Sequence, residues 1–495
     1  MKPFVFLIEA GLRSFADEKL FAGKSAREKA ELWAAETQDS CGTDCIKTPV
    51  SLPSLLKHMC GQLSARNADT AVLAFADCPF LNAALTAEML DLHKKYRAEY
   101  TFADGYPYGF TPEIIDAGTL KILLKLAESK EDFTQGDVKP DSLFSLIKTD
   151  INSFEIETLI APRDYRYLRL NFSCSSKRDT LACRRLFNLL PDCTEAALLC
   201  EKARSTAEIQ RTLPAFYNIQ ICSSEGGESM YEPAVTTSAL PASMELASFN
   251  TLLKKISDFS DDAVISLSFL GEPLRHPDFV LFAEAVASYK NLSLLIETDG
   301  QNLDEQTAVR IQKAFSAHRP GSGVDAPVNW IVKLDACDEQ TYKTVRKKGS
   351  LEAAEKTAAL LKTLFPGAVY PQMVRMKANE HQLEAFFRRW KAEGELIIQK
   401  YDYISGLLED LRPADLSPAV RTPCWHIKRD MCILADGSVP RCKTAVFFSE
   451  PSYGNVFTEE LETVWARGAE KLKEQLQGLY TGTCEKSDEY YTFNF

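Results

Sequence analysis

Short apolar runs alternate with amphipathic stretches along most of the chain, and this alternation predicts an α/β protein. Runs such as FVFLI (4–8), TAVLAFADCPF (70–80) and NLSLLIETDG (291–300) are typical of buried strands. Stretches such as LEAAEKTAALLKTLF (351–365) instead carry apolar residues at helical spacing. The alternation restarts near Leu213, so the pattern predicts two successive α/β regions.

The region after Leu213 repeats strand–helix units over about 200 residues, which predicts a parallel sheet, open or closed into a partial barrel. In such folds the functional groups lie at the carboxyl ends of the strands. The residues at these expected strand ends are Gly271-Glu272-Pro273, Glu297-Thr298-Asp299-Gly300, Asp335 and Lys377-Ala378-Asn379.

The length of 495 residues is too great for one core and predicts several domains, which we place at 1–200, 210–410 and 415–495. A net charge of −12 argues against an electrostatic nucleic-acid binder. The first apolar run meets Glu9 at once and is too short for a signal peptide or a membrane span. We therefore expect a cytoplasmic protein.

The cysteines fall into two groups. Of the 14 in the chain, the nine from Cys41 to Cys222 stand mostly alone on apolar segments, as small buried hydrophobic residues do. The C-x3-C pair Cys41 and Cys45 has no further Cys or His at ligand spacing nearby, which disfavours a metal site. Cys337 stands alone, and the remaining four cysteines lie near the C-terminus: Cys424, Cys432, Cys442 and Cys484.

In the first 200 residues, Asp77 ends an expected strand near basic loop residues such as Lys19 and Lys24. A carboxylate beside phosphate-binding cations suits a Mg–nucleotide site, although a strand-capping Asp with solvated lysines explains the pattern equally well. This region resembles the cytidylyltransferases, which have a glycosyltransferase-A-like fold. The resemblance rests on Arg13, Ser14, Lys19, Gly23, Lys24, Asp77, Pro79, Phe80, Pro107, Gly109 and Glu113. It implies further metal-binding carboxylates on a late strand, where this chain has Asn171 and Ser173, so Mg²⁺ binding is disfavoured.

The middle region resembles the radical SAM superfamily through Gly271-Glu272-Pro273, Thr298-Asp299-Gly300 and Lys333-Leu334-Asp335-Ala336 followed by Tyr342. The resemblance implies an S-adenosylmethionine site, with the Gly-Glu-Pro turn approaching the amino group of the ligand. The residues implied to bind it are Gly271, Glu272, Pro273, Thr298, Asp299 and Asp335.

The same resemblance implies three cluster-binding cysteines (C-x3-C-x2-C) in the first loop of the barrel, since three thiolates leave one iron free for the ligand. In one register the positions are Cys222, Gly226 and Ser229; in the other, which also aligns Pro233, they are Glu225, Ser229 and Glu232. Carboxylate and hydroxyl oxygens are poor ligands for such a cluster. Reductive cleavage of S-adenosylmethionine is therefore not expected here.

The C-terminal region resembles the SPASM/twitch domain, which holds an auxiliary iron–sulfur cluster. The pattern is Cys424-x12-Gly437-x4-Cys442, then Trp465 and Cys484, with an expected tight turn at Asp436-Gly437. The resemblance implies Cys424, Cys442 and Cys484 as cluster ligands and Cys432 as a further candidate, while Ser487 replaces the usual fourth cysteine. A cluster with one substitute ligand and a domain without iron both remain open.

As a whole, the chain resembles the spiro-SPASM proteins of spirochaetes. We expect a radical SAM/SPASM-like protein repurposed for binding or scaffolding, with a peptide or protein partner. One alternative is a peptide- or protein-modifying enzyme that uses the C-terminal cluster. Another is a Mg-dependent nucleotidyl- or glycosyltransferase that uses Asp77.

Overall fold

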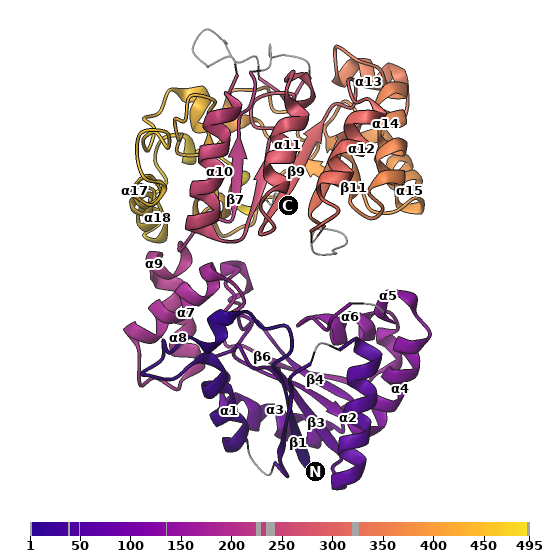
Figure 1. Cartoon of the computed structure of the whole chain (residues 1–495), viewed down its shortest axis with the longest axis vertical. Helices are drawn as coiled ribbons and strands as arrows, with labels where there is room; N and C mark the ends of the chain where they lie inside the picture. The colour runs from indigo at the N-terminus through magenta and orange to yellow at the C-terminus, as the bar shows by residue number, and fades with distance from the viewer. Residues whose placement is uncertain are drawn as a thin grey trace. The chain divides into compact units, whose positions relative to one another are not determined.

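The computed structural model describes residues 2–37, 40–48, 50–134, 136–223, 229–233, 243–318 and 326–492. It divides the chain into two compact units, Met1–Thr212 and Leu213–Phe495 (Figure 1). Each unit contains a sheet covered by helices, so the predicted α/β class is confirmed. Among the described residues, every helix is too short or too polar to span a bilayer.

The first unit is built on a six-stranded sheet with the order β2-β1-β3-β5-β4-β6, in which β5 runs antiparallel to both neighbours. Its strands are β1 (Pro3–Ile8), β2 (Thr43–Ile46), β3 (Thr70–Phe75), β4 (Tyr100–Asp104), β5 (Glu113–Asp116) and β6 (Ile156–Ile160). Its helices are α1 (Ala26–Glu36), α2 (Leu52–Arg66), α3 (Ala83–Tyr96), α4 (Ala117–Glu128), α5 (Glu131–Thr134), α6 (Ser142–Lys148), α7 (Lys177–Leu189), α8 (Ala196–Ser205) and α9 (Ala207–Gln210).

Strand β1 shows why this sheet needs helices on both faces. All six of its residues are buried. Phe4 and Phe6 pack with α2 and α4, whereas Val5 and Leu7 pack with α1 and α3. Because successive side chains of a strand point to opposite faces, a wholly apolar strand must be covered on both sides.

The second unit is built on a seven-stranded parallel sheet with the order β12-β11-β10-β9-β8-β7-β13. Its strands are β7 (Phe216–Ile219), β8 (Ala263–Ser266), β9 (Leu292–Thr298), β10 (Val328–Lys333), β11 (Val369–Arg375), β12 (Ile397–Lys400) and β13 (Asp430–Ile433). Its helices are α10 (Leu246–Ser260), α11 (Phe279–Ala287), α12 (Glu305–Ala314), α13 (Glu339–Val345), α14 (Leu351–Leu364), α15 (Leu383–Ala392), α16 (Trp425–Arg429), α17 (Leu461–Arg467) and α18 (Ala469–Leu476).

The two faces of this sheet have different chemistry. Outward residues such as Ile296 and Trp330 join the large core beneath the helices. Inward residues change character along each strand. Nearer the amino ends they form an apolar layer: Phe216, Leu295, Ile331 and Tyr370. Two residues further along they form what we call the polar layer: Asn218, Ser266, Glu297, Lys333, Gln372 and Gln399.

The C-terminal region contributes a strand to the same sheet. Strand β13 pairs in parallel with β7, with Asp430 opposite Phe216. The turn at Asp436-Gly437 forms as the sequence predicts: Gly437 has φ +83° and donates its N–H to the carbonyl of Leu434. The residues predicted as a third domain therefore share a sheet with the predicted barrel.

Candidate functional site

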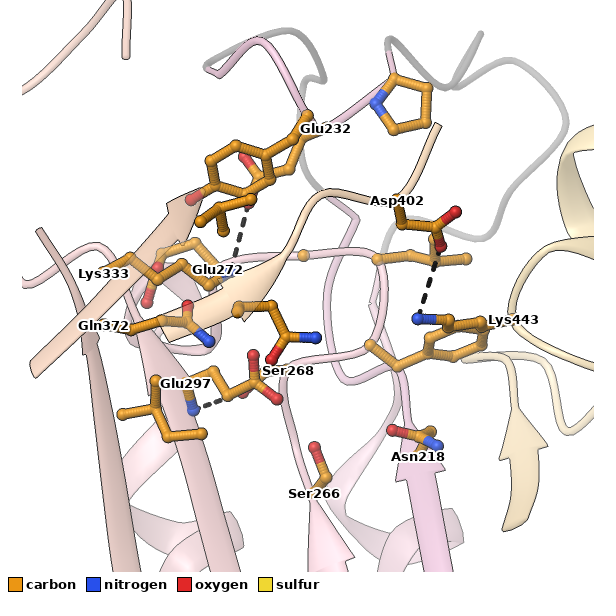
Figure 2. Close-up of a pocket in the computed structure, with 18 of the residues that line it drawn as sticks. Asn218, Glu232, Ser266, Ser268, Glu272, Glu297, Lys333, Gln372, Asp402 and Lys443 are labelled. Carbon is orange, nitrogen blue, oxygen red and sulfur yellow. Dashed lines mark hydrogen bonds and ion pairs between the residues drawn. The ribbon is translucent and has the colours of Figure 1, made fainter. Parts of the chain in front are cut away.

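The concave face of the second unit encloses a cavity of about 530 Å³ at the carboxyl ends of the strands (Figure 2). Its floor is the polar layer, supplied by strands β7 to β12. Its rim includes Gly271, Glu272 and Asp299, and Lys443 closes the side next to the C-terminal region. The cavity lies where a parallel α/β sheet is expected to carry its ligand.

The carboxylate of Glu272 joins two turns at the rim. It accepts hydrogen bonds from the Thr298 hydroxyl and the Asp299 N–H, both at 2.8 Å, and from the Leu274 N–H at 3.2 Å. Burial, together with repulsion from Asp299, raises the pKa of Glu272 to about 7. The side chain therefore positions the Gly-Glu-Pro turn against the Thr-Asp-Gly turn.

The structure brings three of the six expected S-adenosylmethionine residues to the cavity wall: Gly271, Glu272 and Asp299. Thr298 lies just behind the wall, fully buried, and donates to Glu272. Pro273 begins a 3-10 turn, Pro273–Arg275, beyond the rim. These five residues thus come from two adjacent turns, and Asp335 has a different environment.

Asp335 is fully buried at the end of β10 and has φ +61°. Its carboxylate forms an ion pair with Arg346 at 3.1 Å and accepts hydrogen bonds from the Tyr231 hydroxyl at 2.7 Å and the Val374 N–H at 2.9 Å. Since Met230 also donates its N–H to the carbonyl of Val345, this network fixes residues 229–231 beside α13. These contacts give Asp335 a structural role.

The first loop does not fit an iron–sulfur cluster. Cys222 is its one thiol, because the sequence has no other cysteine between Cys200 and Cys337. That thiol donates to the carbonyl of Glu272 at 3.1 Å, and burial raises its pKa to about 11, so it is protonated at neutral pH. Glu225 and Gly226 lie outside the described residues.

The two other candidate positions in this loop are described. Ser229 is buried and forms an antiparallel bridge with Arg346. Glu232 forms an ion pair with Lys333 of the polar layer at 3.1 Å. Burial alone would raise the pKa of Glu232, but Lys333 and Arg346 lower it to about 2. The loop therefore presents a charged pair at the cavity where the family resemblance implies thiolates.

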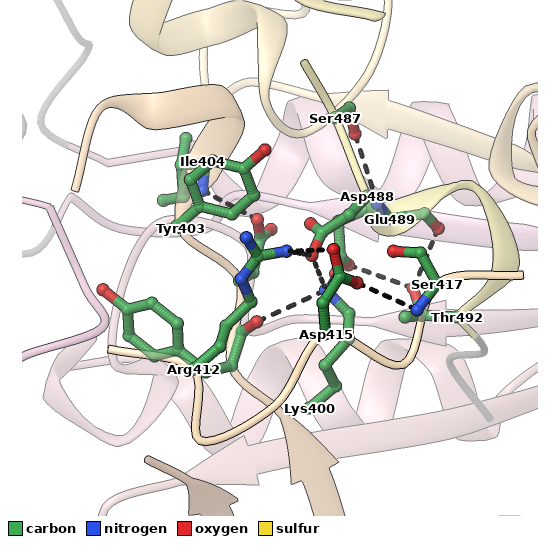
Figure 3. A network of polar contacts seen from close by, with 12 residues as sticks. Lys400, Tyr403, Ile404, Arg412, Asp415, Ser417, Ser487, Asp488, Glu489 and Thr492 are labelled. Atoms are coloured by element: carbon green, nitrogen blue, oxygen red, sulfur yellow. Dashed lines mark hydrogen bonds and ion pairs between the residues drawn. The ribbon is translucent and has the colours of Figure 1, made fainter. Parts of the chain in front are cut away.

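The C-terminal wall of the cavity is held by a network of ion pairs (Figure 3). Glu489 pairs with Lys400 at 2.9 Å and with Lys443 at 2.6 Å, and Asp488 pairs with Lys400 at 3.0 Å. Asp402, Asp488 and Glu489 have oxygens within 4.8 Å of one another. Because these lysines neutralise the carboxylates, we interpret the group as an ion-pair network and not as a metal site.

Cys424, Cys442 and Cys484, the three cysteines that the SPASM/twitch resemblance implies, lie near one another in the second unit. Burial, together with repulsion from the neighbouring thiols, raises the pKa of Cys424 to about 12 and that of Cys442 to about 11. Cys432 is buried beside Cys442, and its pKa is also raised. The structure thus brings together the cysteines that the sequence singles out.

The spacing of these thiols bears on what they could hold. Tetrahedral zinc needs sulfurs about 3.8 Å apart, given Zn–S bonds of about 2.3 Å. Among the described residues, no three of these thiols lie within 4.8 Å of one another. As placed, these thiols therefore do not form a three-thiolate site for a single ion.

Gln475 of α18 lies between two of these cysteines and was not expected from the sequence. Its side-chain carbonyl accepts from the Cys424 N–H at 2.8 Å, and its amide donates to the Cys484 sulfur at 3.5 Å. The residue is 2% exposed. An interior glutamine on an amphipathic helix has no motif that could have identified it.

In the first unit, Asp77 lies beside a second carboxylate, that of Asp179 in the first turn of α7. Asp77 is 4% exposed, and burial raises its pKa to about 6, with repulsion from Asp179 as a further cause. The nearby Ser173 hydroxyl also offers an oxygen. These are the donor types that Mg²⁺ prefers. Sequence reasoning missed Asp179 because it lies on the helix and not on the preceding strand.

Sequence comparison places the chain beside a bacterial relative. Over 366 residues, which make up 71% of this chain and 98% of the relative, it is 38% identical to an uncharacterized protein of Treponema pallidum (strain Nichols). The chain belongs to the family of this protein. No protein-family model matches the sequence.

The chain is also similar, at low sequence identity, to solved structures of several other proteins. BtrN in complex with AdoMet and 2-DOIA is 17% identical, with a TM-score of 0.37 over 57% of this chain and 93% of that one. Streptococcus suis SuiB bound to the precursor peptide SuiA is 13% identical, with a TM-score of 0.42 over 70% and 83%. A cytidylyltransferase from Leptospira borgpetersenii is 12% identical, with a TM-score of 0.35 over 43% and 96%.

Proposed function

We propose that the second unit binds S-adenosylmethionine, or another nucleoside that carries a free amino-acid group, without cleaving it reductively. The observation that carries the proposal is the rim, where Glu272 joins the Gly-Glu-Pro and Thr-Asp-Gly turns at the edge of the cavity. The adjacent loop supplies a Glu232–Lys333 pair and one protonated thiol. The chain would then be a radical SAM/SPASM-like protein of the spiro-SPASM type, repurposed for binding or scaffolding with a peptide or protein partner.

Calorimetry with S-adenosylmethionine tests this directly. We expect saturable binding to the wild-type chain and at least about tenfold weaker binding to Glu272→Gln, because the amide has one acceptor oxygen and an NH2 group, and cannot accept both the Thr298 O–H and the Asp299 N–H on separate oxygens as the carboxylate does. Glu384→Gln, at an exposed position of α15, is the matched control and should bind like the wild type. Dithionite-reduced protein should release no 5′-deoxyadenosine. No binding, or reductive cleavage, would contradict the proposal.

The gathered C-terminal thiols support a second candidate, an enzyme or electron-transfer protein whose metal centre is an iron–sulfur cluster at Cys424, Cys442 and Cys484. The cluster would supply one-electron chemistry at that end of the unit. Anaerobically purified protein would then contain about four irons per chain. Cys442→Ala should lose them, whereas Cys193→Ala in the first unit should not. Iron-free wild-type protein after anaerobic reconstitution would rule this candidate out.

A further inference from the structure

Three side chains on the floor of the cavity have no partner within the described chain. They are the carboxylate of Glu297 and the amides of Gln372 and Gln399, and they come from β9, β11 and β12. None of them forms a side-chain hydrogen bond or ion pair with another described residue. Figure 2 shows Glu297 and Gln372 directed into the same space. Enclosed polar groups are nearly always hydrogen-bonded, so these three are available to a ligand.

The cations of the cavity are, by contrast, already neutralised by carboxylates of the chain. Lys333 lies 3.1 Å from Glu232, and Arg346 lies 3.1 Å from Asp335. Lys400 and Lys443 lie 2.9 Å and 2.6 Å from Glu489. An anionic ligand would have to compete with these carboxylates for each cation.

Glu297 is different, because no cation lies within ion-pair distance of it among the described residues. Its charge acts from a distance on Lys333 and Lys443 and helps to raise the pKa of each, against burial, which would lower it. Among the described residues of the floor, the charged group without an ion-pair partner is therefore the carboxylate of Glu297, which is negative. A cationic group placed there would meet a carboxylate without breaking an existing pair.

The neighbouring amides narrow the class of cation. A primary ammonium has three N–H donors and no acceptor. One donor can go to Glu297, and the side-chain carbonyls of Gln372, two strands away, and Gln399, three strands away, offer further acceptors on the same floor. The apolar layer beneath, with Leu295 and Ile331, closes the floor and excludes water from below. A fully methylated ammonium would leave the amide oxygens unused.

We propose that the floor of the cavity binds the primary ammonium group of a ligand through Glu297, with Gln372 and Gln399 as additional acceptors. The inference rests on the proposed function in that it concerns the same cavity, and it adds a second binding position below the rim. Such an ammonium belongs either to a free small amine or to a lysine side chain of a peptide.

Three probes of similar size test the charge preference: butylammonium, butyramide and butyrate, titrated at constant ionic strength and followed by ligand-observed NMR. We expect butylammonium to bind the wild-type chain at least about tenfold more tightly than butyrate. Glu297→Gln, which keeps the size of the side chain, should reduce butylammonium binding about tenfold. Glu384→Gln removes the same charge from an exposed site and should leave it unchanged, which excludes attraction to the net charge alone.

A fourth probe distinguishes the two sources. Nα-acetyl-lysine methylamide carries the same ammonium with two peptide groups. Tighter Glu297-dependent binding than that of butylammonium would assign the floor to a lysine in a peptide, and equal or weaker binding to a free amine. Either result supports the ammonium site.

The inference is overturned if butylammonium binds no better than butyrate, or if Glu297→Gln binds it as the wild type does, with near-native circular dichroism confirming that the variant is folded. These outcomes do not depend on the S-adenosylmethionine titration. Amine binding without S-adenosylmethionine binding would refute the proposed function alone. The reverse result would refute the ammonium site alone.

Discussion

Replacing Arg346 with methionine is expected to destabilise the second unit by about 3–5 kcal/mol, because it leaves a buried charge without its partner. Asp335 is fully buried, and the Arg346 side chain is 3% exposed. After the change, Asp335 would keep the donors of Tyr231 and Val374 but no compensating cation. Urea denaturation followed by tryptophan fluorescence measures this, since four of the five tryptophans lie in the second unit.

Two further variants separate loss of charge balance from loss of packing. Arg388→Met, at a site 78% exposed, should change stability by less than about 0.5 kcal/mol. Adding Asp335→Asn to Arg346→Met should recover part of the lost stability, because the buried charge is then removed as well. An Arg346→Met variant as stable as the wild type would show that the pair does not hold this part of the unit together.

The second large effect is expected from Gly271→Ala. A Cβ at this position would overlap the carbonyl oxygen of Cys222 and would lie 3.2 Å from the Cys222 sulfur. Since the overlap is with backbone, the Gly-Glu-Pro turn and the chain at Cys222 would have to separate, at a cost of about 2–3 kcal/mol. The same displacement moves Glu272, so we also expect binding of S-adenosylmethionine to be lost. Chemical denaturation and calorimetry measure the two effects.

Gly61→Ala provides the matching control for this substitution. Gly61 lies within α2, where an added Cβ has no neighbouring atom within 4 Å. The change should stabilise the first unit by up to about 1 kcal/mol through helix propensity. If both alanine variants behaved alike, the close approach of Gly271 to the Cys222 backbone would not be the reason for the glycine at this position.

Much of the fold could be predicted, because the pattern of apolar residues reports burial directly. The continuous apolar run of β1 and the helical stripe of α14 identify those elements without knowledge of their partners. The strand-end turns could be located for the same reason. What local pattern could not show is that β13 joins the sheet beside β7, since strand pairing depends on contacts between distant segments.

The candidate site was harder to predict, because the availability of a side chain depends on its neighbours in space. Glu272 has the stronger motif, yet its carboxylate accepts three hydrogen bonds from its own chain. Glu297 has an ordinary strand-end position, yet its carboxylate faces the cavity without a partner among the residues that the structure describes. Lys443 reaches the cavity from a distant segment and is oriented by Glu489. None of these relations is encoded by local spacing.

The alternation of the inward and outward residues has an evolutionary consequence. On β9, Ile296 packs against the helices while its neighbour Glu297 faces the cavity, and on β11 Met373 and Gln372 are related in the same way. Substitutions in the polar layer can therefore change ligand preference with little effect on the core beneath the helices. Lineages that share this fold can diverge in specificity through these few positions, so conservation of the outward residues alone would not imply a common ligand.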